Sequence, residues 1–177
     1  MTDIVLVEDA PVVTQHPELA WVRLPIGMQP QQQSNWCWSA TTVSVANYYG
    51  DNLTQCGFAN TLLSRTDCCG MGAAGPCNVP NALVAALQTA GHLASWRTGA
   101  PSFGDLQPEI DAARPVTVRI QWSGGGGHFL AVVGYLTGST TWVAVDDPAF
   151  GPSDLLLTTL TTAYQTTGSV DEIHFTM

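Results

Sequence analysis

The chain has 177 residues, of which 45% are hydrophobic and 11% are charged, so it can bury the core of one domain and is not composed like a disordered protein. It has 14 acidic residues, five arginines and no lysine, and its net charge of −9 argues against a protein that binds nucleic acid through the phosphate backbone. No stretch approaches the roughly 20 apolar residues that span a membrane, and no basic leader of a signal peptide is visible.

The first third of the chain predicts an extended arm, a short strand and one buried helix. Residues 1–20 are expected to form the arm and residues 20–26 the strand. Residues 36–49 are predicted to be helical, because a glycine follows the last of them and Ser34 or Asn35 can cap the start. Apolar side chains surround the axis of this helix instead of forming one stripe, so the helix should be buried.

Helical patterns continue to the middle of the chain, and alternating β-branched patterns follow. We predict helices over residues 54–63, 80–91 and 103–110 and a strand over 93–97, then strands over 116–122, 128–136, 141–145 and 170–175 with a short helix near 160–164. Helices first and strands afterwards indicate an α+β fold. We expect a single domain over residues 21–177, with a helical half over 34–113 and a β half over 115–177.

The five cysteines separate into one isolated residue, Cys37, and a cluster. The other four lie within about twenty residues of one another: Cys56, Cys68, Cys69 and Cys77. An odd cysteine beside an even cluster predicts one reactive thiol and two disulfides, which form in an oxidising environment. Of the three pairings, we disfavour the one that joins adjacent Cys68 and Cys69, because a bridge between neighbours is strained. The alternative is a zinc site, for which the cluster lacks a C-x2-C pair and a nearby histidine.

Cys37 lies in the first turn of the predicted buried helix. Backbone N–H groups and the helix dipole at that end stabilise a thiolate and favour a nucleophilic cysteine. The backbone N–H of Cys37 can also bind a developing oxyanion. The alternative interpretation is a small buried apolar residue, which is common for a free cysteine.

His128 is the histidine best placed to act as a base for this thiol. It opens an apolar strand directly after four glycines, which let a backbone approach a substrate or form a flexible turn. A hairpin would bring the end of the next strand, Asp146-Asp147-Pro148, back beside His128. One of the two carboxylates could then fix the tautomer of the imidazole. The alternative is an ordinary Asp-Pro turn at the end of a strand.

Three segments together resemble the motifs of papain-like cysteine peptidases. Residues 31–40 (QQQSNWCWSA) are similar to the nucleophile motif, residues 126–135 (GGHFLAVVGY) to the histidine strand, and residues 145–148 (VDDP) to the strand of the third residue. The likeness extends over roughly residues 20 to 177. It is strongest to the compact bacterial branch that includes bacteriocin-leader peptidases and effector peptidases with a Trp-Cys-Trp motif.

The resemblance implies a fold, a reaction and the roles of four residues. The fold would pack a helical part that carries the nucleophile on an antiparallel β-sheet that carries the histidine and the aspartate. Gln31 would line the oxyanion hole, Cys37 would be the nucleophile, His128 the general base and acid, and Asp147 the residue that orients the imidazole. A shifted register would bring in a neighbouring glutamine (Gln29, Gln32 or Gln33), and Asp147 is preferred to Asp146 because the family pattern places this residue just before the proline. The reaction would be hydrolysis of a peptide or protein substrate through an acyl-enzyme, with no cofactor and no metal.

Related chemistries and a different class of protein are the alternatives. Deamidases, transglutaminases and peptidoglycan amidases use a similar Cys-His-Asp set, so the fold alone does not separate them. A binding module with an idle site is the alternative outside the enzymes. The predicted disulfides favour a secreted or exported protein, including an effector or toxin delivered to another cell, whereas the lack of a visible signal peptide favours the cytoplasm. The sequence leaves the oligomeric state open.

Overall fold

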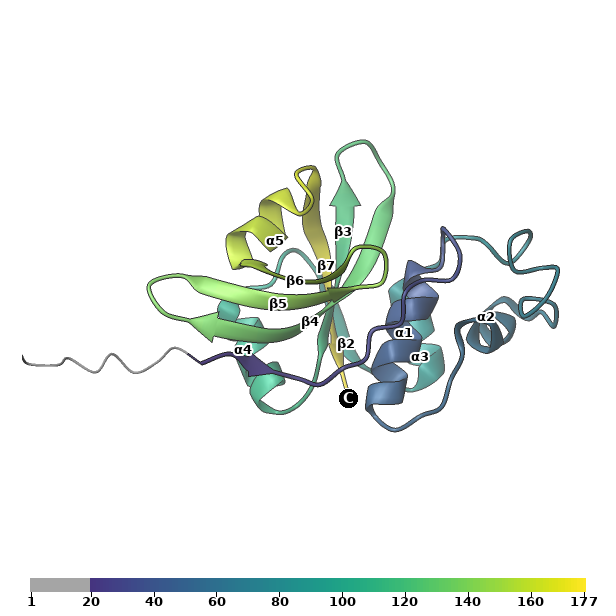
Figure 1. Cartoon of the computed structure of the whole chain (residues 1–177), viewed down its shortest axis with the longest axis horizontal. Coiled ribbons are helices and arrows are strands. Elements are labelled where there is room, and N and C mark those ends of the chain that lie inside the picture. The colour runs from purple at the N-terminus through teal and green to yellow at the C-terminus, as the bar shows by residue number, and fades with distance from the viewer. Residues whose placement is uncertain (1–19) are drawn as a thin grey trace, which may run out of the picture.

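A group of helices lies beside one antiparallel β-sheet, as Figure 1 shows. The structure is a computed structural model and describes residues 20–177. The arm predicted over residues 1–20 lies outside this range except for Ala20. The helices are α1 (Cys37–Tyr48), α2 (Gln55–Leu63), α3 (Leu83–Ala90), α4 (Phe103–Asp111) and α5 (Leu157–Ala163). The arrangement confirms the α+β fold with a helical part and an antiparallel sheet. None of the helices within the described residues is long and apolar enough to cross a membrane.

The sheet has seven strands, all paired antiparallel. They are β1 (Val22–Arg23), β2 (Leu93–Thr98), β3 (Val116–Trp122), β4 (Gly127–Thr137), β5 (Thr141–Asp147), β6 (Gly151–Leu156) and β7 (Gly168–Thr176). Their order is β2-β7-β3-β4-β5-β6, and β1 pairs with the far end of β4. β2 therefore belongs to the sheet, although it lies within the segment expected as the helical half. α4, which lies in the same segment, packs against β4, β3 and β1.

The predicted buried helix is confirmed as α1, which buries every residue from Cys37 to Ala46. The predicted cap is wrong. Trp36 occupies the N-cap position without a side-chain hydrogen bond, while the backbone N–H of Asn35 donates to the side chain of Asn78 at 2.9 Å. The residues before α1 thus bond to another loop instead of to their own helix.

α3 begins later than the sequence predicts. Pro80 was expected in its first turn, but the helix begins at Leu83 and ends before Gly91, which takes the expected left-handed conformation. The carbonyl oxygens of Cys77 and Val79 accept hydrogen bonds from tryptophan side chains of the α1 region. The segment before α3 is consequently held as an extended wall against α1.

Three apolar clusters make up the interior of the described residues. The first joins the helical part to the sheet through Phe129 of β4 and includes Trp36, Trp38, Val43, Phe58, Leu83 and Leu87. The second lies between the sheet and the helices α4 and α5, and it includes Leu106, Val118, Ile120, Leu130, Leu160 and Tyr164. The third is small and consists of Ala131, Val133 and Ala144 of β4 and β5, against which the segment before α1 packs.

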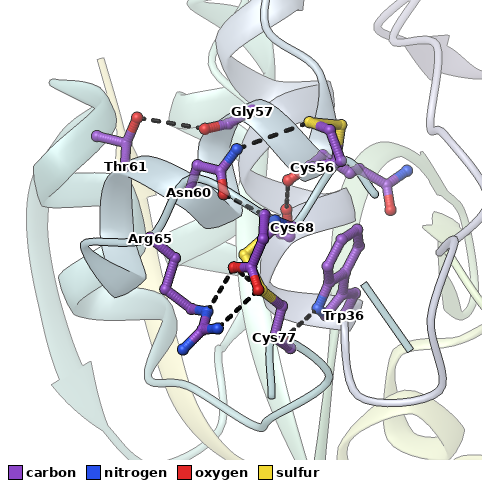
Figure 2. The surroundings of a disulfide bond; sticks show 12 residues. Trp36, Cys56, Gly57, Asn60, Thr61, Arg65, Cys68 and Cys77 are labelled. Atoms are coloured by element: carbon purple, nitrogen blue, oxygen red, sulfur yellow. Dashed lines mark hydrogen bonds and ion pairs between the residues drawn. A yellow bond between two sulfur atoms is a disulfide. The ribbon is translucent and has the colours of Figure 1, made fainter. Parts of the chain in front are cut away.

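The four clustered cysteines form two disulfides, Cys56–Cys69 and Cys68–Cys77. The pairing avoids a bridge between neighbours, as expected, and the engagement of all four sulfurs excludes the zinc alternative. Figure 2 shows how the surrounding loop is braced: Asn60 accepts from the backbone of Cys68 at 2.9 Å, and Arg65 donates twice to Asp67 at 2.8 Å. The two disulfides indicate an oxidising environment.

Candidate active site

Cys37 lies at the N-terminal end of α1, where the helix meets the sheet. Within residues 20–177 it is the cysteine without a disulfide partner. The N–H of a first-turn residue has no helical carbonyl to bind, so the backbone of Cys37 can donate to a substrate oxygen. The indole N–H groups of Trp36 and Trp38 donate to the carbonyl oxygens of Cys77 and Val79 at 2.7 and 2.9 Å. Both tryptophans therefore fasten the start of α1 to the disulfide-linked loop.

One hydrogen bond fixes α1 against the strand that carries the histidine. Thr41, about one turn after Cys37, is fully buried and donates through Oγ1 to the carbonyl oxygen of Phe129 at 3.2 Å. Phe129 follows His128 in β4, so this bond holds the thiol and the imidazole in register. Sequence reasoning missed Thr41, because nothing local distinguishes it from the other polar residues of a buried helix.

His128 and Asp147 form a buried pair at the end of a hairpin. β4 and β5 are antiparallel neighbours whose register pairs Ala131 with Asp146, so the start of β4 lies near the end of β5. Nε2 of His128 lies 2.8 and 2.9 Å from the two carboxylate oxygens of Asp147. Since Nε2 is engaged by Asp147, Nδ1 is the ring nitrogen left for Cys37, whose side chain is near enough to contribute to the raised pKa of His128. The structure thus brings together Cys37, His128 and Asp147.

The pair is electrostatically matched. Burial disfavours the imidazolium, but the hydrogen bond and charge of Asp147, together with the neighbouring Cys37 side chain, outweigh it and raise the pKa of His128 to about 9. Burial likewise acts to raise the pKa of Asp147, yet the hydrogen bond and the charge of His128 bring that pKa below its ordinary value. At neutral pH the pair is therefore an imidazolium and a carboxylate.

Asp147 is held by more than the histidine, whereas Asp146 is not part of this contact. Oδ1 of Asp147 accepts from the backbone N–H groups of Ala149 and Phe150 at 2.6 and 2.9 Å, and Oδ2 accepts from the hydroxyl of Tyr164 at 2.7 Å. The pKa of Asp146 is raised, mainly by burial. Of the two candidate aspartates, the geometry therefore supports the one just before the proline.

Two aromatic rings contact the imidazole, and a third packs on one of them. Trp122 stacks on His128 with ring centroids 6.1 Å apart, and Phe150 meets His128 edge-on at 5.9 Å. The ring of Tyr164 stacks on the ring of Trp122, with centroids 6.3 Å apart. These rings exclude water from the His128–Asp147 hydrogen bonds and thereby strengthen them. Sequence reasoning missed all three rings, because they come from separate segments and no local pattern links them.

Replacing Tyr164 with phenylalanine should remove one donor from a buried carboxylate. We expect a loss of about 1.5 to 3 kcal/mol in the free energy of unfolding, measured by urea denaturation. Because the Tyr164 hydroxyl lowers the pKa of Asp147, the acidic limb of the activity profile should move to higher pH. Tyr135→Phe is the matched control, since Tyr135 donates to Asp111 at 2.6 Å away from this site. An unchanged acidic limb would restrict Tyr164 to a structural role.

Gln31 lies near the triad, and its side chain faces the loop before α1. Its backbone N–H donates to the carbonyl oxygen of Pro148 at 2.8 Å, beside Asp147. Its amide Nε2 donates to the carbonyl oxygens of Gln33 and Ser34, each at 3.0 Å. Among the described residues, its buried Oε1 has no hydrogen-bond partner. The oxyanion role implied by the resemblance requires this amide to turn towards Cys37.

Gln55 organises the glutamine-rich loop and was missed from the sequence. Its buried side chain accepts from the backbone N–H of Gln32 at 3.0 Å and donates to the carbonyl oxygen of Pro30 at 2.9 Å. It also donates to Gln29 at 3.2 Å. Gln29 and Gln32 are thus tied to α2, whereas the backbone of Gln31 bonds to the strand end beside Asp147.

A cleft of about 450 Å³ opens beside Cys37 at the seam between helices and sheet. Its helical wall consists of Trp38, Pro80, Asn81 and Ala82, and its sheet wall of Arg119, Gly127, Phe129 and Glu172. Away from the cleft, one group of side chains within the described residues has the residue types that bind metal ions, namely Asp67, Cys68 and Cys77. The sulfurs of that group are joined in a disulfide, so it does not form a metal centre.

The chain matches one family model and is similar in fold to a solved peptidase domain. A sequence model described as the Peptidase_C39 like family matches residues 22–171. The peptidase domain of Streptococcus ComA, a bifunctional ABC transporter involved in a quorum-sensing pathway, is similar in structure with a TM-score of 0.55 and 18% identity, over 88% of this chain and 98% of that one. A double glycine motif protease from an AMS/PCAT transporter, solved with the leader peptide, has a TM-score of 0.47 and 18% identity, over 88% and 94% of the two chains. No curated protein sequence matches.

Proposed function

We infer the reaction from one premise: this chain belongs to the Peptidase_C39 like family, a group of papain-like cysteine peptidases. We propose that it hydrolyses peptide bonds with Cys37 as nucleophile, His128 as general base and acid, and Asp147 as the residue that orients the imidazole. The observation that carries the proposal is the buried His128–Asp147 hydrogen bond in the neighbourhood of Cys37, which lies at a helix N-terminus that opens on a cleft.

The proposed chemistry is acyl transfer in two halves. The thiolate of Cys37 attacks the carbonyl carbon, and the resulting oxyanion is bound by the backbone N–H of Cys37 and by the Gln31 amide once it has turned. The imidazolium of His128 gives its proton to the amine, which leaves as the new N-terminus. Neutral His128 then takes a proton from water, the hydroxide attacks the thioester, and the carboxylic acid leaves, which restores the Cys37 thiolate and the His128 imidazolium. Asp147 keeps the imidazole in the required orientation throughout.

We also propose that the substrate is a peptide or an extended protein segment and that the protein acts after export. A cleft between two walls suits an extended chain, and the disulfides favour a compartment outside a reducing cytoplasm. Proteolysis as the damaging activity of a delivered effector is compatible with this setting.

Product analysis tests the reaction. The purified protein is incubated with a mixture of blocked peptides, and new amino termini are identified by mass spectrometry, with Cys37→Ala as the blank. New termini that depend on Cys37 support peptide hydrolysis. Ammonia release without chain cleavage, incorporation of an added amine, or cleavage restricted to muropeptides would replace it with the deamidase, transglutaminase or amidase alternative.

A further inference from the structure

The sheet wall of the cleft carries charged groups that the triad does not use. Arg119 projects from β3, and Asp171 and Glu172 come from the neighbouring strand β7, where Glu172 is the register partner of Arg119. Arg119 and Glu172 line the same cleft as Cys37. Two carboxylates and one guanidinium leave one negative charge on this wall.

The guanidinium is already committed to other partners. One terminal nitrogen of Arg119 donates to Asp171, and the other donates to Gln121 at 2.8 Å. Glu172 is farther away, with its Oε1 at 3.8 Å from the nitrogen that binds Asp171. Arg119 therefore neutralises Asp171 first, and Glu172 carries the surplus charge.

Behind Glu172 lies a buried histidine that does not supply the missing positive charge. His174 is fully buried, and its Nε2 lies 3.5 Å from Oε2 of Glu172. Its Nδ1 lies 3.3 Å from the carbonyl oxygen of Thr117, which can only accept, so Nδ1 bears the proton of the neutral ring. Burial lowers the pKa of His174 to about 4, so Nε2 is a lone pair at neutral pH. Consistently, Nε2 of His174 and Oδ1 of Asp171 are buried without hydrogen-bond partners among the described residues.

The cluster lies next to the reacting centre. Gly127 precedes His128, and a Cβ at Gly127 would be 2.9 Å from Nε of Arg119, so the glycine is what allows the guanidinium to lie over this strand. The opposite wall offers the exposed apolar surfaces of Pro80 and Ala82. A long side chain with an aliphatic stem and a charged end would contact both walls.

We propose that Glu172 selects a basic residue, lysine or arginine, at a substrate position adjacent to the scissile bond. The stem of that residue packs on the helical wall, and its cationic end donates to Glu172. The proposal rests on the proposed peptidase function, names the substrate class for the same site, and agrees in sign with the net charge of −9.

The test compares blocked hexapeptides that differ at one position at a time, where lysine, glutamine or glutamate replaces alanine. We expect kcat/KM to be about tenfold higher for lysine than for glutamine at one position. Glu172→Gln should reduce this preference to within about twofold, and Glu172→Lys should favour glutamate instead. Glu109→Gln is the matched control, because Glu109 pairs with Arg114 outside the cleft. Thermal unfolding of each variant shows that it is folded.

The same peptides separate failure of the subsite from failure of the reaction. If they are cleaved without a charge preference, or if Glu172→Gln keeps the preference, the subsite is overturned and the peptidase function stands. If none is cleaved, calorimetric binding to the Cys37→Ala protein decides the subsite independently. Tighter binding of the lysine peptide that is lost in a Cys37→Ala, Glu172→Gln double variant supports it, and equal binding of all peptides overturns it.

Discussion

Replacing His128 with alanine should lower kcat/KM for peptide hydrolysis by about a thousandfold or more, because both proton transfers pass through its imidazole. The same change should sharply slow the alkylation of Cys37 by iodoacetamide at pH 6 to 7, since the imidazolium that pairs with the sulfur is lost. Intact mass spectrometry reports this rate directly, and Cys37→Ala must abolish the added mass. Because the other four cysteines form disulfides, a single adduct is expected.

The pH dependence of the two proteins gives a second readout of the same pair. The folded-state pKa of His128, about 9, lies above its ordinary value of 6.5. Its contribution to stability is therefore fully present below about pH 6.5 and is lost as the pH rises through about 9. The free energy of unfolding of the wild type should fall relative to that of His128→Ala across this window. Equal slopes, together with unchanged alkylation, would show that Cys37 and His128 do not act as a pair.

Opening the Cys68–Cys77 disulfide by a double serine substitution should impair both stability and catalysis. A bridge that closes a loop of this size contributes about 2 to 4 kcal/mol to the free energy of unfolding. The carbonyl oxygen of Cys77 also holds the Trp36 indole, and the chain continues directly into Pro80, a residue of the cleft wall. We therefore expect kcat/KM to fall about tenfold or more, mainly through a raised KM.

The second disulfide provides the matched control for this prediction. Cys56–Cys69 is more exposed, because Cys69 lies at the surface while Cys68 and Cys77 are fully buried. Its double serine variant should lose stability while KM changes little. If both double variants raise KM equally, the effect comes from general loosening of the loop, and the Cys77–Trp36 contact has no special part in the cleft.

The sequence predicts best where local pattern and tertiary packing agree. Residues 116–122 alternate and are β-branched, and β3 covers that range. The start of α3 was misplaced because the carbonyl groups near Pro80 accept hydrogen bonds from tryptophan side chains at a sequence separation of 41. The disulfide pairing also depended on the fold of the loop, because the spacing of the cysteines alone left two pairings open.

The same contrast holds within the candidate site. His128 and Asp147 were predicted because a hairpin brings neighbouring strand ends together, and the structure places them in contact. Tyr164 and Gln55 could not be found in this way, because each reaches its partner from a different element and leaves no motif behind. The motif identifies the residues proposed to react, and the tertiary fold alone reveals the residues that hold them.

The coexistence of one thiol and two bridges sets limits on the redox potential at which the protein works. Oxidants, including low-molecular-weight disulfides, would convert Cys37 to a mixed disulfide or a sulfenic acid and block its sulfur. Strong reductants would open the exposed Cys56–Cys69 bridge first and, once they also open the buried Cys68–Cys77 bridge, would loosen the loop beside the cleft. The usual practice of adding excess thiol to a cysteine peptidase would therefore first rescue and then disable this one. Its activity should be greatest at an intermediate thiol concentration, at which Cys37 stays reduced and both disulfides stay intact.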